Sequence, residues 1–156
     1  MTAPESRPWL PPSWFIHVAW RVHRGLYRMS RGRRFLWSTG GKRGWGAMRL
    51  TTVGRKSGQE RSVILAYLED GPNLFTLAMN GWDEGDPAWW LNLQANPDAV
   101  VRLAGQEPVR VRARAAEGAE QERLWRMWLT VDKGVEAYAA ARRTPTPVVV
   151  LEPRGA

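Results

Sequence analysis

A chain of 156 residues suits one compact domain, and the absence of cysteine, with only two histidines, excludes disulfides, thiolate metal sites and a histidine-only zinc site. No apolar run approaches the roughly 20 residues needed to span a bilayer, and the N-terminus lacks a signal-peptide pattern, so we expect a cytoplasmic protein. Ten Lys and Arg against one Glu lie in the first 50 residues, so the net charge of +8 belongs to an N-terminal appendage and does not indicate a nucleic-acid-binding face.

Residues 1–46 are predicted to form this appendage, with a proline-rich start, a helix over 13–30 and a Gly/Arg-rich loop over 30–46. One face of the helix is apolar and the opposite face basic, with Trp14, Trp20 and Tyr27 on the flanks. The helix either packs on the rest of the protein, with its arginines in water, or contacts an anionic membrane surface at the inner face of the plasma membrane. The two interpretations are compatible with each other.

Residues 47–156 show short strands, bounded by turn residues, and a few helices. The predicted strands cover 48–53, 62–68, 73–79, 99–103, 109–114 and 146–151. The predicted helices cover 88–95, 117–130 and 135–142. In 109–114, Val109, Val111 and Ala113 alternate with arginines, which predicts a half-buried strand. Several antiparallel strands with peripheral helices predict an α+β barrel.

The turn between the first two strands, within Thr51–Arg61, is the strongest local signal for binding. Its two glycines allow a tight turn, and Arg55, Lys56 and Arg61 add three cations to the donors Ser57 and Gln59. Arg grips phosphate through two parallel hydrogen bonds, and Lys adds a point charge. The pattern therefore indicates an anion site, although a solvated basic hairpin would have the same composition. The spacing is not that of a nucleotide P-loop.

A second cluster, Leu77–Leu93, combines a strand end, a Gly-containing loop and a helix start, and helix starts favour anions and ring carbonyls. Trp89 and Trp90 point in different directions on a helix, so we expect at most one to line a pocket. We expect Asp83, Glu84 and Asp86 to form a solvated acidic loop. No catalytic triad or metal motif is present, which favours chemistry supplied by a cofactor.

The segments TTVGRKSGQERSV, LAMNGWDEGDPAWWLNLQANPDA and TPVVVLEP resemble the deazaflavin-dependent nitroreductase family over roughly residues 45–153. The resemblance implies a split β-barrel related to the pyridoxamine-phosphate oxidases. It also implies bound coenzyme F420 and direct hydride transfer from its C5 to a hydrophobic acceptor such as a quinone or nitroaromatic. The alternatives are use of FMN or a binding role without turnover at the membrane surface, with the chain a monomer or a homodimer.

By position, the resemblance assigns the cofactor's phosphate and acidic tail to one group of residues and its ring to another. The first group is Arg55, Lys56, Ser57, Gly58, Gln59 and Arg61; the second is Met79, Asn80, Gly81, Pro87, Ala88, Trp89 and Asn92. Asn80 replaces a lysine that many relatives carry, which removes one cation. Tyr138 is the remaining tyrosine before the last strand and the candidate catalytic residue, unless it is simply a wall of the core. The loss of the other tyrosines argues against nitroreduction.

Overall fold

The computed structural model describes Trp14, Phe15, Val18 and residues 36–155. Most of the predicted helix over 13–30, and the Gly/Arg-rich loop up to residue 35, therefore lie outside the described residues. Trp14, Phe15 and Val18 are exposed, Trp14 to 63%. Nothing in the described part of the chain forms a helix long and apolar enough to cross a membrane.

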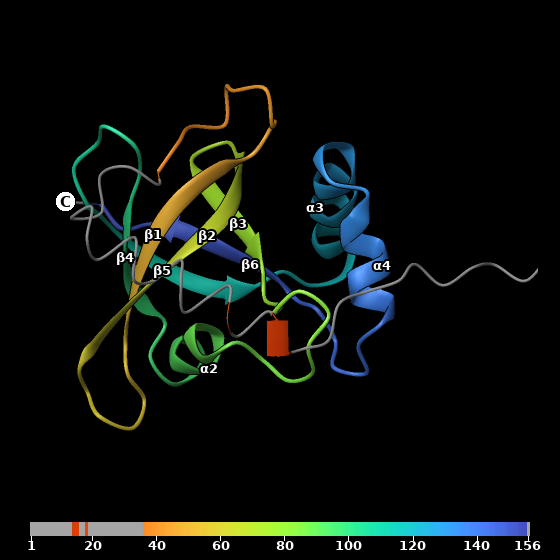
Figure 1. The fold of residues 1–156 in the computed structure, drawn as a ribbon. Coiled ribbons are helices and arrows are strands. Elements are labelled where there is room, and N and C mark those ends of the chain that lie inside the picture. The colour runs from red at the N-terminus through yellow and green to blue at the C-terminus, as the bar shows by residue number, and fades with distance from the viewer. Residues whose placement is uncertain (1–13, 16–17, 19–35, 156) are drawn as a thin grey trace, which may run out of the picture.

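Six antiparallel strands close into a barrel in the order β1-β2-β3-β6-β5-β4 (Figure 1). They are β1 (Gly46–Val53), β2 (Glu60–Asp70), β3 (Asn73–Leu77), β4 (Asp98–Arg102), β5 (Val109–Ala115) and β6 (Val148–Pro153). Closure comes from β1, which pairs with both β2 and β4, and from β6, which lies between β3 and β5. The predicted α+β barrel is confirmed.

Within residues 36–155, three helices lie outside the barrel: α2 (Ala88–Ala95), α3 (Gly118–Val131) and α4 (Gly134–Ala140). In Figure 1, α2 lies at one end of the barrel, while α3 and α4 stand together at its side. The predicted bounds of α2 are confirmed. The predicted strand 146–151 is wrong by two residues, because Pro147 has no N–H for a ladder and its carbonyl instead accepts from Ala78 N. β3 ends at Leu77, two residues before the predicted end, and Met79 N turns back to donate to Leu77 O at 3.0 Å.

The core has two parts, one enclosed by the barrel and α2 and the other lying between the sheet and the helices α3 and α4. β6 contributes to both, since Val149 and Leu151 join the first part while Val148 and Val150 join the second. Four consecutive apolar residues are therefore buried, as expected of a strand covered on both faces. In β5, Val111 and Ala113 are buried as predicted, but Val109, at the strand's first position, is 40% exposed.

Gly46 opens β1 because no side chain fits at that position. A Cβ there would lie 2.4 Å from Cε1 of Tyr67, which is 1% exposed. Overfilling a packed core costs about 1–3 kcal/mol, so Gly46→Ala is expected to lower the free energy of unfolding in urea by that amount. Gly40→Ala is the matched control, since an added Cβ meets nothing within 4 Å there. Equal stability of the two variants would contradict the packing argument.

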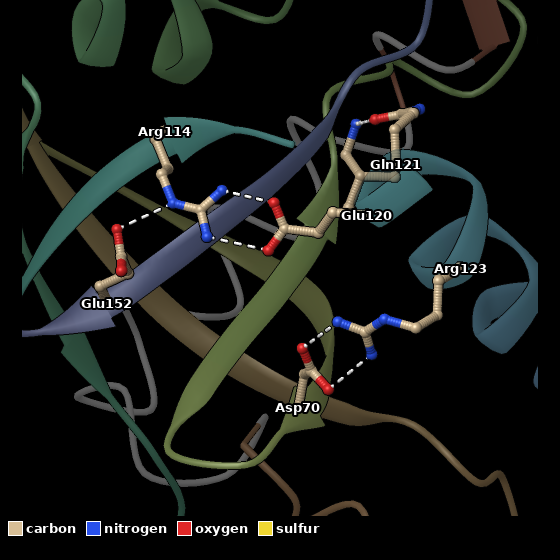
Figure 2. A network of polar contacts seen from close by, with 7 residues as sticks. Asp70, Arg114, Glu120, Gln121, Arg123 and Glu152 are labelled. Atoms are coloured by element: carbon tan, nitrogen blue, oxygen red, sulfur yellow. Dashed lines mark hydrogen bonds and ion pairs between the residues drawn. The ribbon is translucent and has the colours of Figure 1, made fainter. Parts of the chain in front are cut away.

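Two ion-pair groups fasten α3 to the barrel (Figure 2). Arg123 donates to both carboxylate oxygens of Asp70, at 2.9 Å each. Arg114 of β5 donates two hydrogen bonds to Glu120 and a third, at 2.9 Å, to Glu152 of β6. These contacts place α3 over β6 and close the second part of the core.

Acid is expected to weaken this attachment. The hydrogen bonds from Arg123 lower the pKa of Asp70, and those from Arg114 lower the pKa of Glu120. Carboxyl groups that are more acidic in the folded chain stabilise it above their unfolded pKa, near 4, and lose that contribution as the pH falls below it. The loss per pair is small, because the side chains are partly exposed and water screens the charges. Urea unfolding between pH 7 and pH 3 measures it, and Asp70→Asn should flatten part of the acid slope. An unchanged slope in that variant would assign the acid sensitivity to other carboxylates.

Candidate functional site

The β1–β2 turn is a compact, glycine-dependent structure. Gly54 N donates to Gln59 O at 2.7 Å, and Gly58, with φ of 69°, donates to Gly54 O at 2.8 Å. A Cβ on Gly54 would lie 2.8 Å from Ser57 Oγ and 3.1 Å from the Gln59 carbonyl oxygen. The backbone therefore folds back on itself more tightly than a larger residue at position 54 would allow.

The three cations of this turn all face solvent. Arg55, Lys56 and Arg61 are exposed, and within the described residues none of them forms an ion pair with a carboxylate. Arg114 of β5 and Arg123 of α3, by contrast, are paired with carboxylates. An uncompensated group of cations beside exposed backbone suits a phosphate or a chain of carboxylates. The geometry fits the predicted anion site.

Asn92 of α2 connects this helix to the β1–β2 turn through hydrogen bonds. It is 4% exposed, and its Oδ1 accepts from Arg55 N at 3.1 Å and from Arg55 Nη1 at 3.2 Å. Its Nδ2 donates to Oγ1 of buried Thr52 at 3.1 Å. The side chain thus joins β1, the turn and α2, and it directs the Arg55 guanidinium. The family resemblance assigned Asn92 to the residues beside the cofactor ring. In the structure Asn92 contacts Arg55, which belongs to the residues predicted to bind the phosphate.

The start of α2 offers backbone donors and little else. Pro87 is the N-cap and no side chain caps the helix, so the N–H groups of Ala88 and Trp89 lack intrahelical partners, while Trp90 N donates to Pro87 O at 3.0 Å. Pro87 is buried and Ala88 is exposed. Trp89 and Trp90 are 7% and 6% exposed and pack edge to face, with ring centroids 6.4 Å apart. Both belong to the first part of the core, which agrees with the expectation that at most one of them lines a pocket.

The loop from residue 78 to residue 86 leaves β3 and leads into α2. Met79, Asn80 and Gly81 are half-buried, and Trp82 packs against Tyr138 of α4, with ring centroids 5.5 Å apart. Glu84 is exposed but accepts from Arg143 N at 2.7 Å and from Thr144 N at 3.1 Å, which lowers its pKa. Glu84 is therefore solvated, as expected, but it is also held in place by the backbone of residues 143–144.

Arg142 is the functional candidate that the sequence did not reveal. It is 7% exposed and hydrogen-bonds to both ends of this loop. Local sequence predicted only the end of a helix there, and no spacing rule connects position 142 with positions 78 and 85. The structure thus brings the predicted residues together in two groups, one around the turn and one around the loop, which lie on either side of α2 in Figure 1.

A protein family described as F420H(2)-dependent quinone reductase matches residues 20–153. The chain belongs to this family. An F420H(2)-dependent quinone reductase of Mycobacterium tuberculosis is 32% identical over 141 residues, covering 86% of this chain and 89% of the relative. A second relative from the same species, named as a putative F420H(2)-dependent quinone reductase, is 32% identical over 106 residues, covering 64% and 83% of the two chains.

Solved structures of similar chains agree with the barrel. An F420-H2 dependent reductase superposes with a TM-score of 0.61 at 30% identity, over 68% of this chain and 93% of that one. A structure described as a domain-swapped dimer has a TM-score of 0.65 at 27% identity, over 87% and 97%. A structure from Listeria innocua described as a putative pyridoxamine 5'-phosphate oxidase, at 16% identity and a TM-score of 0.51 over 70% and 84%, shares the fold alone. The predicted split barrel, F420 cofactor and oxidoreductase class are confirmed for the family; the individual site residues stay predictions.

Proposed function

We propose that this chain uses reduced F420 to reduce an apolar quinone to its hydroquinone. The observation that carries the proposal is the β1–β2 turn, whose three exposed cations have no carboxylate partner among the described residues. A cofactor with a phosphate and an acidic tail requires such a site. Membership of the F420H(2)-dependent quinone reductase family supports the same cofactor. When bound, reduced F420 supplies the hydride for the acceptor.

The turn residues are proposed to hold the phosphate and tail. Arg55 and Arg61 would grip anionic oxygens in pairs, Lys56 would add charge, and the backbone of Gly58 would allow close approach. Ser57 and Gln59 are the neutral donors beside them. Asn92 is proposed to act mainly by presenting the Arg55 guanidinium, since its oxygen already accepts twice from that residue.

The ring end is proposed to lie between the loop and the start of α2. Met79, Asn80 and Gly81 would border the ring, and the open N–H groups near Ala88 would donate to its carbonyl oxygens. Pro87 and Trp89 are buried, so their part is to shape and support this wall. The neutral Asn80 contributes no charge near the ring.

Tyr138 is proposed as the catalytic residue on the acceptor side. Quinone reduction takes a hydride and a proton, and the Tyr138 hydroxyl is the proposed proton source, refilled from solvent. Its half-buried ring also packs against Trp82, so the pair forms an aromatic surface suited to a flat acceptor. Tyr138→Phe keeps this packing and is expected to lower kcat without weakening F420 binding. Unchanged kcat would remove Tyr138 from the chemistry.

The test of the function has two arms. Titration with F420 and with FMN, followed by fluorescence, measures which flavin binds, and oxidation of reduced F420 by menadione measures turnover. We expect tight F420 binding, weaker FMN binding and rapid oxidation. F420 binding without turnover across a panel of quinones would show that the chain binds the cofactor but does not catalyse quinone reduction. Preference for FMN would reject the cofactor assignment.

Three finer features belong to the proposal. Quinones are proposed as better acceptors than nitroaromatics, because Tyr138 is the remaining tyrosine in its stretch.

Residues 13–30 are proposed to rest on an anionic membrane surface, with support from exposed Trp14, Phe15 and Val18. Deletion of residues 1–30 should then abolish binding to anionic liposomes. A homodimer is proposed by analogy with the domain-swapped structure, and sedimentation measures it.

A further inference from the structure

Arg142 lies between α4 and β6, where its guanidinium bridges the two ends of the 78–86 loop. Nη2 donates to Gly85 O at 2.8 Å, and Nη1 donates to Thr146 Oγ1 at 3.1 Å and to Ala78 O at 3.4 Å. Ala78 is the first residue after β3, and Gly85 comes shortly before α2. One side chain therefore fixes where the loop begins and where it ends.

A second set of contacts fastens the same loop from outside. Glu84 accepts from the backbone N–H groups of Arg143 and Thr144 and from Thr144 Oγ1, at 2.7, 3.1 and 2.9 Å. Thr144 Oγ1 also accepts from Gly85 N at 3.0 Å. We call the contacts of Arg142, Glu84 and Thr144 with this loop and the segment 142–146 the loop clasp. It connects residues nearly 60 positions apart in the chain.

The loop clasp buries the charge of Arg142, which costs more free energy than a purely structural contact would require. Arg142 is 7% exposed, and among the described residues it donates to two carbonyls and a hydroxyl while its Nε has no hydrogen-bond partner. The Glu84 carboxylate lies near enough to interact with it electrostatically but forms no direct ion pair with it. Burying a charge without a direct ion pair costs more than burying an apolar side chain of similar size. Connecting loops are ordinarily mobile, whereas this loop is held at both ends. Its central residues, Met79–Gly81 and Trp82, are those proposed to face the ring and the acceptor.

We propose that Arg142 is a positioning residue, which through the loop clasp sets the loop residues against the F420 ring and the acceptor. The inference rests on the proposed function for its kinetic consequence. Misplacing reacting groups by about 1 Å can cost on the order of 100-fold in rate, so a loosened loop lowers turnover. Cofactor affinity changes little, because the cations that hold the phosphate lie on the other side of α2.

The test compares Arg142→Met with Arg143→Met, which removes the same charge from the exposed neighbour. Arg142→Met is expected to lower kcat for menadione by about 10- to 100-fold while the F420 dissociation constant stays within about 3-fold. Arg143→Met should match the parent chain, and Arg142→Lys should recover part of the loss. Hydrogen exchange of the cofactor-free protein should show faster exchange over residues 78–86 in Arg142→Met only.

Glu84→Ala provides a second route, because Glu84 is exposed and its loss releases the loop without opening the core. It should lower kcat in the same direction even where Arg142→Met fails to fold. The proposal is overturned when F420 affinity and kcat fall by one common factor, or when loop exchange is unchanged. A parent chain that fails to reduce quinones rejects the proposed function instead, and the exchange measurement then still decides whether the clasp orders the loop.

Discussion

Replacing Arg55 and Lys56 together with alanine is expected to weaken F420 binding by at least about 100-fold. A hydrogen bond to a charged group contributes about 1.5–3 kcal/mol, and each 1.4 kcal/mol is tenfold in affinity. Both side chains are exposed, so the barrel should fold unchanged. Fluorescence titration with F420 at two salt concentrations measures the loss, and the salt dependence of binding should shrink along with the affinity.

A matched control separates a specific phosphate grip from general attraction. Arg110 and Arg112 are exposed on β5, and replacing both with alanine removes the same charge from a different part of the barrel. This control should bind F420 nearly as the parent does; a comparable loss would show that net charge alone holds the cofactor. FMN has no acidic tail, so the Arg55 and Lys56 replacement should weaken FMN less. Equal losses for the two flavins would count against placing the tail at this turn.

Asn92→Leu is expected to reduce both stability and cofactor affinity. The change leaves the buried Thr52 hydroxyl without its partner, and an unsatisfied buried group costs about 1–3 kcal/mol. The partly buried Arg55 N–H loses its acceptor as well. The change also releases the Arg55 guanidinium from its fixed direction. Urea unfolding and F420 titration measure the two effects separately.

Asn92→Asp tests whether Asn92 orients the Arg55 guanidinium for the cofactor or only packs α2 against the barrel. The carboxylate keeps an acceptor for Arg55 but neutralises its charge, so we expect F420 affinity to fall more than stability. Gln94→Leu on the exposed side of the same helix is the control and should change neither quantity. If Asn92→Leu lost stability but retained full affinity for F420, Asn92 would support α2 without directing Arg55.

The barrel and its turn were accessible from sequence because both depend on short-range patterns. Alternation in β5 identified the buried positions Val111 and Ala113, and the glycines with cations identified the β1–β2 turn. The predicted start of β6 was wrong because Thr146 and Pro147 precede the strand. Thr146 Oγ1 accepts a hydrogen bond from Arg142, and Pro147 O accepts one from Ala78 N. Strand boundaries of this kind depend on tertiary partners, which local propensity does not contain.

The connections within the site escaped prediction because they join side chains far apart in the sequence. Asn92 meets Arg55 across 37 positions, and Arg142 meets Ala78 across 64. Single-sequence patterns carry no information on such pairs. Trp89 and Trp90 were expected to contribute at most one pocket wall, and the structure buries both of them in the first part of the core.

The position of β6 between β3 and β5 determines when the barrel can close during synthesis of the chain. β6 is the last of the six barrel strands in chain order, yet it hydrogen-bonds with both β3 and β5. Without it, both neighbours expose open edges and α3 has no apolar surface of β6 to cover. The barrel therefore cannot close before β6 has been synthesised, and a chain cut before Val148 would be a substrate for chaperones and proteases rather than a shorter enzyme.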